Sequence, residues 1–145
     1  MLRSRRAGVW LAEGRGMIHI VALMVAAALL PLVASISSKL GGEGFDNREP
    51  RLWLQAQKGW RARANAAQAN SYEALPFFYA AVLFALYAQA PLAHLAVLMG
   101  AWVTVRLVYL ALYVGGYGSL RSLSWVAAFA LNLLILYAGL QAAGG

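Results

Sequence analysis

The sequence predicts an all-α integral membrane protein, an up-down bundle of four transmembrane helices. Two observations lead to this prediction. Hydrophobic residues make up 62% of the chain and charged residues only 12%, and the apolar residues gather in four long runs. A soluble domain of 145 residues has too little interior to hide so much apolar surface, whereas a bilayer accommodates it. The length is typical of a single domain.

The four apolar runs set the expected helices. The first, from Met17 to about Ser37, has roughly the 20 residues that a spanning helix needs. Gln89-Ala90-Pro91 forms a short turn between the second and third runs, and a glycine-rich break separates the third from the fourth. We therefore expect one transmembrane domain over residues 17–142, with helices at about 17–37, 64–89, 92–114 and 122–141.

Residues 1–16 form a basic segment without the apolar pattern of the spans. Two interpretations remain open for this segment. It is either a genuine basic tail, or an over-long start ahead of Met17, which stands immediately before the first run.

Basic residues also predict the topology. With four spans, the segment 39–63 and the break before the last helix share one side, which carries seven basic residues against four in the tail. The positive-inside rule places this side in the cytoplasm and both termini outside. The seven are Lys39, Arg48, Arg51, Lys58, Arg61, Arg63 and Arg121.

Composition argues against several functions. The net charge of +7 is a topology signal in a membrane protein, and no nucleic-acid module accompanies it, so we expect no nucleic-acid partner. The absence of cysteine excludes thiolate metal sites and a cysteine nucleophile. His19 and His94 stand alone, without other convergent ligands, so no metal site is expected.

Polar residues within the apolar runs indicate where a site would lie. Charges at the centre of a spanning helix cost at least ~2.5–3.5 kcal/mol and usually face a protein interior. At 100° per residue, polar side chains form a stripe on each of the last three expected helices. The stripes are Arg63, Asn70 and Glu73; Arg106, Tyr109 and Tyr113; and Arg121, Trp125 and Asn132.

These stripes have two interpretations. They line a shared cleft, or they are polar seams that hold the helices together, with the asparagines as interhelical hydrogen-bonding groups. In a cleft, arginines would bind carboxylates, a glutamate would bind an ammonium group, and tyrosine hydroxyls would donate to an anion. A small zwitterion with two carboxylates and one amine matches this set. No Ser–His or paired-carboxylate pattern suggests hydrolysis.

One run resembles the signature of a known family. Residues 63–78 read RANAAQANSYEALPFF, with an arginine–alanine start, Asn70, a glutamate three residues on and a proline three beyond that. Together with DNREPR at 46–51, Tyr109, Tyr113 and the run RSLSW at 121–125, it resembles the bacterial branch of the MAPEG family, the membrane-associated proteins of eicosanoid and glutathione metabolism.

The resemblance implies a homotrimer in a bacterial inner membrane that binds glutathione between subunits, near the cytoplasmic face. On the second helix, Arg63, Gln68, Asn70 and Glu73 match glutathione-binding positions. Tyr109 and Tyr113 resemble the tyrosine pair that lines the site from the adjacent subunit, and Arg121 resembles the catalytic arginine that stabilises the thiolate. The chain departs from the pattern at Ala66, where glutathione-using members have a second arginine.

Three functions follow as hypotheses. The first is a glutathione-dependent transferase or peroxidase whose lipophilic substrate arrives through the bilayer. The second, which Ala66 favours, is a non-catalytic scaffold or lipid-binding protein of the same fold. The third is a transporter or channel, suggested by Glu73 and Arg106, although the sequence has no internal repeat or broken helix pair.

Overall fold

The computed structural model describes the backbone of residues 2–144 and the side chains of residues 14–144. Over this part of the chain the protein is all-helical, as the sequence predicts. There are four long helices and one short one. They are α1 (Leu2–Lys39), α2 (Pro50–Gln55), α3 (Gly59–Tyr87), α4 (Leu92–Gly115) and α5 (Gly118–Ala143).

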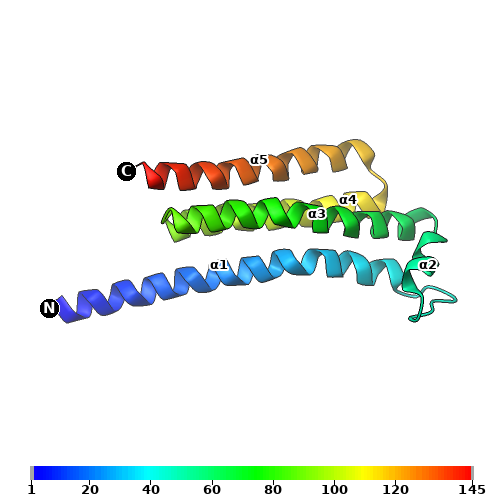
Figure 1. Ribbon diagram of the computed structural model, residues 1–145, viewed down its shortest axis with the longest axis horizontal. Helices are drawn as coiled ribbons and strands as arrows, with labels where there is room; N and C mark the ends of the chain where they lie inside the picture. The colour runs from blue at the N-terminus through cyan, green and yellow to red at the C-terminus, as the bar shows by residue number, and fades with distance from the viewer. Residues whose placement is uncertain (1, 145) are drawn as a thin grey trace.

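The long helices run alternately up and down (Figure 1). α1 packs against α3 and α4, and α5 packs against the other faces of the same two helices. The connection 40–58, with α2, and the turn between α4 and α5 lie at one end of the bundle, which we call the loop end (Figure 1). The turn between α3 and α4 lies at the opposite end.

Three helical segments in the described part of the chain have the length and apolar composition to cross a membrane: Gly14–Lys39, Leu92–Gly115 and Gly118–Ala143. They correspond to the first, third and fourth expected spans. α3 is long enough but carries many polar residues in its first half, so a fourth span stays a prediction.

The helix bounds differ from expectation at three places. α1 begins at Leu2 and continues without a break through the basic segment. α3 begins at Gly59, before the apolar run, so that its first turns extend out of that run. α2 was not predicted from the polar connection; Pro50 stands in its first turn, where the fixed proline φ suits a helix and the missing N–H costs nothing.

Small residues allow the helices to approach closely. The fully buried alanines of α1 and α3 leave room for large side chains from α4, and the Trp102 indole stacks on the Phe78 ring at 4.0 Å between centroids. Alanine-rich contacts of this kind are typical of helix packing in membranes. The fully buried alanines of these two helices are Ala27, Ala64, Ala67, Ala81 and Ala85.

Arg61 closes the end of α1. Its guanidinium donates hydrogen bonds to the carbonyls of Ser38, Leu40 and Gly41 at 3.3, 2.8 and 3.0 Å, and it lies over the Trp60 ring at 4.3 Å. The last carbonyls of a helix have no intrahelical partner and carry partial negative charge, so a cation there is favourable.

We expect Arg61→Ala to lower the free energy of unfolding by about 1–2 kcal/mol, because three carbonyls lose a charged donor. Unfolding in detergent micelles, followed by circular dichroism, measures this change. The matched control is Arg48→Ala, which removes an exposed arginine of the same connection. An equal effect of the two substitutions would show that Arg61 is not a specific cap.

Candidate functional site

The most buried charge among the described side chains is the guanidinium of Arg106 on α4, which is 1% exposed. It donates two hydrogen bonds to the side-chain oxygen of Asn70, both 3.2 Å long, and one of 3.3 Å to the Asn70 carbonyl. A fourth, also 3.3 Å, goes to the Ser71 hydroxyl. All four acceptors are neutral and belong to α3. The polar stripes of the second and third expected helices therefore meet.

Asn70 connects this buried cation to an exposed carboxylate. While its Oδ1 accepts from Arg106, its amide nitrogen donates to Oε2 of Glu73 at 3.4 Å. Glu73 lies one turn further along α3 and is exposed. The arginine and glutamate charges are thus joined through an amide that satisfies both sides.

Aromatic contacts continue from Arg106 towards the loop end. The Arg106 guanidinium lies 4.2 Å from the centroid of the Tyr109 ring, and Tyr109 meets Tyr113 edge-on at 5.6 Å. The guanidinium of Arg121, in the first turns of α5, lies 4.5 Å from the Tyr113 ring. These contacts form one continuous series, which we call the polar line. It includes Arg106 and five of the seven predicted site residues: Asn70, Glu73, Tyr109, Tyr113 and Arg121.

A cavity of about 300 Å³ lies between α3, α4 and α5 beside this line. Asn70, Glu73 and Arg106 line it on one side, and aromatic side chains line much of the remainder. Its other lining residues are Ala74, Phe77, Trp102, Trp125, Ala128, Phe129 and Asn132. The stripe predicted on the last helix is divided, because Trp125 and Asn132 reach this cavity whereas Arg121 rests on Tyr113.

The other two predicted binding residues lie apart. Arg63 donates from Nε to the Val114 carbonyl at 2.9 Å, so it caps the end of α4. It also passes within 3.5 Å of the position that a side chain would take at Gly116, whose φ of +84° ends α4 in the left-handed conformation. Gln68 faces another cavity, of about 500 Å³, with Lys39, Arg51 and Ala66.

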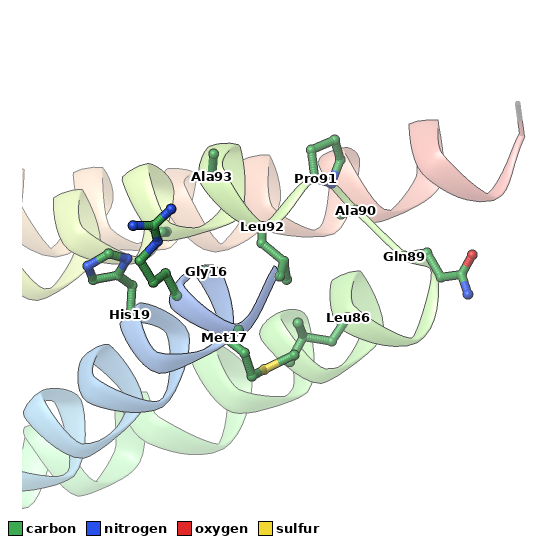
Figure 2. Close-up of a pocket in the computed structure, with 12 residues that line it drawn as sticks. Gly16, Met17, His19, Leu86, Gln89, Ala90, Pro91, Leu92 and Ala93 are labelled. Carbon is green, nitrogen blue, oxygen red and sulfur yellow. The ribbon is translucent and has the colours of Figure 1, made fainter. Parts of the chain in front are cut away.

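The largest of the three cavities, about 1010 Å³, shares no lining residue with the cavity beside Arg106 or with the cavity that Gln68 lines. It lies at the end of the bundle opposite the loop end, between α1 and the α3–α4 turn, where Gly16 lies close to Leu92 and Met17 lies near Leu86 (Figure 2). Its lining includes Arg15 but is otherwise largely apolar, and none of the predicted site residues contributes to it.

A family model described as MAPEG family matches residues 17–141. The chain belongs to the MAPEG family. The searches of curated proteins and of solved structures returned no match. Family membership and three apolar spanning segments together make this an integral membrane protein. The matched residues include the whole site described above.

MAPEG proteins generally use glutathione, which has two carboxylates, an ammonium group and a thiol, so the donor set of this chain can be compared with that ligand. The exposed carboxylate of Glu73 suits the ammonium group, and Arg121, half-buried beside Tyr113, suits an anion. Arg63 has its terminal nitrogens available for a second anion, since among the described residues it donates only from Nε, to the Val114 carbonyl. The charges fit this ligand.

Ala66 lines the cavity of Gln68 and not the one beside Arg106. The arginine that this MAPEG chain lacks would therefore have belonged to the Gln68 surface, where Lys39 and Arg51 already supply positive charge. The departure from the family pattern affects one surface of the molecule and leaves the line from Asn70 to Arg121 complete.

Arg106 was predicted to face the interior but was not among the predicted site residues, and Ser71 and Trp102 were missed. A signal for Arg106 was present in the sequence, because an arginine deep in an apolar run requires a partner. Asn70, a polar residue within the neighbouring expected span, was the matching candidate. Nothing in the sequence distinguishes Ser71 and Trp102 from ordinary packing residues.

Proposed function

We propose that this MAPEG protein is a membrane-bound, glutathione-dependent transferase or peroxidase that acts on lipophilic electrophiles. The observation that supports the proposal best is the continuous polar line from Glu73 through Asn70, Arg106 and the two tyrosines to Arg121. A line of this kind across three helices is costly in a membrane unless it serves a site. The line carries the negative carboxylate of Glu73 and the positive guanidinium groups of Arg106 and Arg121.

Each residue of the line has a proposed task. Glu73 binds the ammonium group of the tripeptide, with its carboxylate held by the Asn70 amide. Arg121 and the Tyr113 hydroxyl stabilise the anionic sulfur, which lowers the pKa of the bound thiol. Glutathione supplies the thiolate nucleophile. The lipophilic partner reaches it from the bilayer, where such molecules concentrate.

The separation of Gln68 from this line favours assembly of the chain as a homotrimer. Gln68 and Asn70 both match glutathione-binding positions, yet within one chain they line different cavities. Both contribute to one site if the Gln68 surface of one subunit faces the Tyr113–Arg121 surface of its neighbour. We further propose that the site lies near the cytoplasmic face of a bacterial inner membrane, because the loop end carries most of the positive charge.

The test uses full-length protein purified in detergent, with glutathione and S-methylglutathione as probes. At 100 times its dissociation constant, glutathione is expected to stabilise the protein by about 2.7 kcal/mol, seen as a rise in Tm. An ultraviolet thiolate signal is expected with glutathione and not with the S-methyl analogue. If neither ligand changes Tm and no thiolate forms, the proposal is wrong.

The second candidate is a non-catalytic scaffold or lipid-binding protein. Ala66 favours it, because the Gln68 surface lacks an arginine that glutathione-using members have. Under this alternative, lipid or a partner protein co-purifies with the chain, and glutathione leaves both Tm and absorbance unchanged. The same measurements therefore decide between the two functions.

A further inference from the structure

The cavity of about 1010 Å³ at the end opposite the loop end takes no part in the proposed thiol chemistry. Its walls come from residues 14–19 of α1 and from residues 86–96, which include the α3–α4 turn. Most of the lining side chains are apolar, but Arg15 and His19 stand among them and are exposed. These two residues are four positions apart, so they lie on the same face of α1. The cavity therefore combines apolar walls with two nitrogen donors on its α1 side.

The charge around this cavity has one sign. None of the described residues that line it is acidic. Over residues 14–144 the acidic side chains are Glu43, Asp46 and Glu49, in the connection at the loop end, and Glu73, in the middle of α3. An apolar site with a positive charge beside it favours a ligand that has an apolar body and an anionic group. A cationic group on the same ligand would find no carboxylate among these lining residues.

The two donors lie at the level where lipid headgroups meet hydrocarbon. Arg15 lies about 17 Å from the midpoint of the span Gly14–Lys39, and His19 about 11 Å, at 1.5 Å per residue. Each half of the hydrocarbon core is about 15 Å deep, so the two residues stand on either side of its boundary. Leu92 and Ala96 lie at the same two levels of the span Leu92–Gly115. The cavity thus reaches from the headgroup layer into the hydrocarbon.

Small residues leave room for an apolar chain. A Cβ at Gly16 would lie 3.1 Å from the Leu92 side chain, so this glycine allows α1 to approach α4 closely. Ala93 and Ala96, about one turn apart on α4, contribute only methyl groups to the wall, and Met17 lies near Leu86 (Figure 2). An acyl chain can contact such a surface without burying an unpaired polar group.

We propose that this cavity binds one phospholipid with a net negative headgroup, of the phosphatidylglycerol type. Arg15 binds the phosphate, the N–H of the His19 ring donates to a phosphate or ester oxygen, and the first part of an acyl chain lies against Ala93 and Ala96. A zwitterionic headgroup offers the same phosphate but brings an ammonium group that these lining residues leave without a partner. The site shares no lining residue with the polar line or with the Gln68 surface, so it is independent of glutathione binding.

The test titrates full-length protein in detergent with dioleoylphosphatidylglycerol or dioleoylphosphatidylcholine, and native mass spectrometry measures the first bound lipid. Wild-type protein is expected to bind the anionic lipid about tenfold more tightly, as one charged hydrogen-bonded contact allows. Arg15→Gln should reduce this preference to about twofold or less, and Arg15→Lys should keep most of it. The matched control is Arg48→Gln, which removes an exposed arginine at the loop end and should leave the tenfold preference unchanged.

A second pair of variants tests the apolar wall. Ala93→Phe fills part of the cavity and should weaken binding of the anionic lipid about tenfold, whereas Val97→Phe should not. Both positions are exposed on α4 and Val97 does not line the cavity, so neither change disturbs the core. Equal effects of the two substitutions would overturn the proposal, because the lipid would then bind the general surface.

Three further results would also overturn it. One is equal affinity for the two lipids, and another is a preference that survives Arg15→Gln. The third concerns glycerol 3-phosphate, which carries the anionic group without acyl chains. It is expected not to displace the bound lipid at equal concentration, because the apolar contacts are missing. Displacement would indicate a site for free phosphate esters and not for a phospholipid.

Discussion

Replacing Asn70 by leucine is expected to lower the free energy of unfolding by about 3 kcal/mol, which would place it among the most destabilising substitutions in this chain. The change keeps the size of the side chain but removes the oxygen that accepts two hydrogen bonds from Arg106. Arg106 is 1% exposed, so its charge cannot turn to water for compensation. Thermal or SDS-induced unfolding in micelles, followed by circular dichroism, measures the loss.

The companion variant Arg106→Met should cost much less, about 1 kcal/mol, because the groups left behind are neutral. Ser71 keeps its bond to the Ala67 carbonyl, and Asn70 keeps its bond to Glu73. Combining the two substitutions should therefore recover part of the stability lost in Asn70→Leu alone. A larger loss from Arg106→Met than from Asn70→Leu would contradict this account.

The apolar runs predicted the all-helical class, the alternation of the long helices and the three segments able to span a membrane. The helix bounds were harder to predict, because hydropathy reports where a helix is apolar and not where it begins. α3 extends back to Gly59 through a polar stretch in which Arg61 and Arg63 bind the carbonyl ends of α1 and α4. Those contacts join residues far apart in sequence, so no local pattern could reveal them.

The site was predictable only one helix at a time. Periodicity grouped Asn70 with Glu73, and Tyr109 with Tyr113, and both pairings agree with the structure. The arrangement of helices around each other then decided which groups met. It brought Arg106 to Asn70, while Gln68, only two residues earlier on α3, lines another cavity. Two residues correspond to a rotation of about 200° around a helix, so Gln68 and Asn70 cannot share a face.

Arg121→Ala is expected to lower the glutathione-dependent turnover of a lipophilic electrophile by about 10²–10³-fold, the usual loss when one group that stabilises a developing anion is removed. The structure gives a reason to choose this arginine over Arg106. Arg121 is half-buried near the loop end, where a water-soluble tripeptide can reach it, whereas the Arg106 guanidinium is already bonded to Asn70 and Ser71. The amino-terminal end of α5 adds partial positive charge beside Arg121.

If Arg121 had only a structural role, the alanine variant would lose stability. Under the proposed role, Arg121→Ala should keep nearly all of its stability, because the side chain contacts the face of the Tyr113 ring, and should lose the thiolate absorbance. Arg121→Lys restores the charge without the planar group and should recover part of the rate, while Arg48→Ala, which removes an exposed arginine, should match wild type. If Arg121→Ala keeps the thiolate signal and turns over within twofold of wild type, the sulfur is stabilised elsewhere. Arg63, whose terminal nitrogens remain available near the end of α4, would then be the residue to replace.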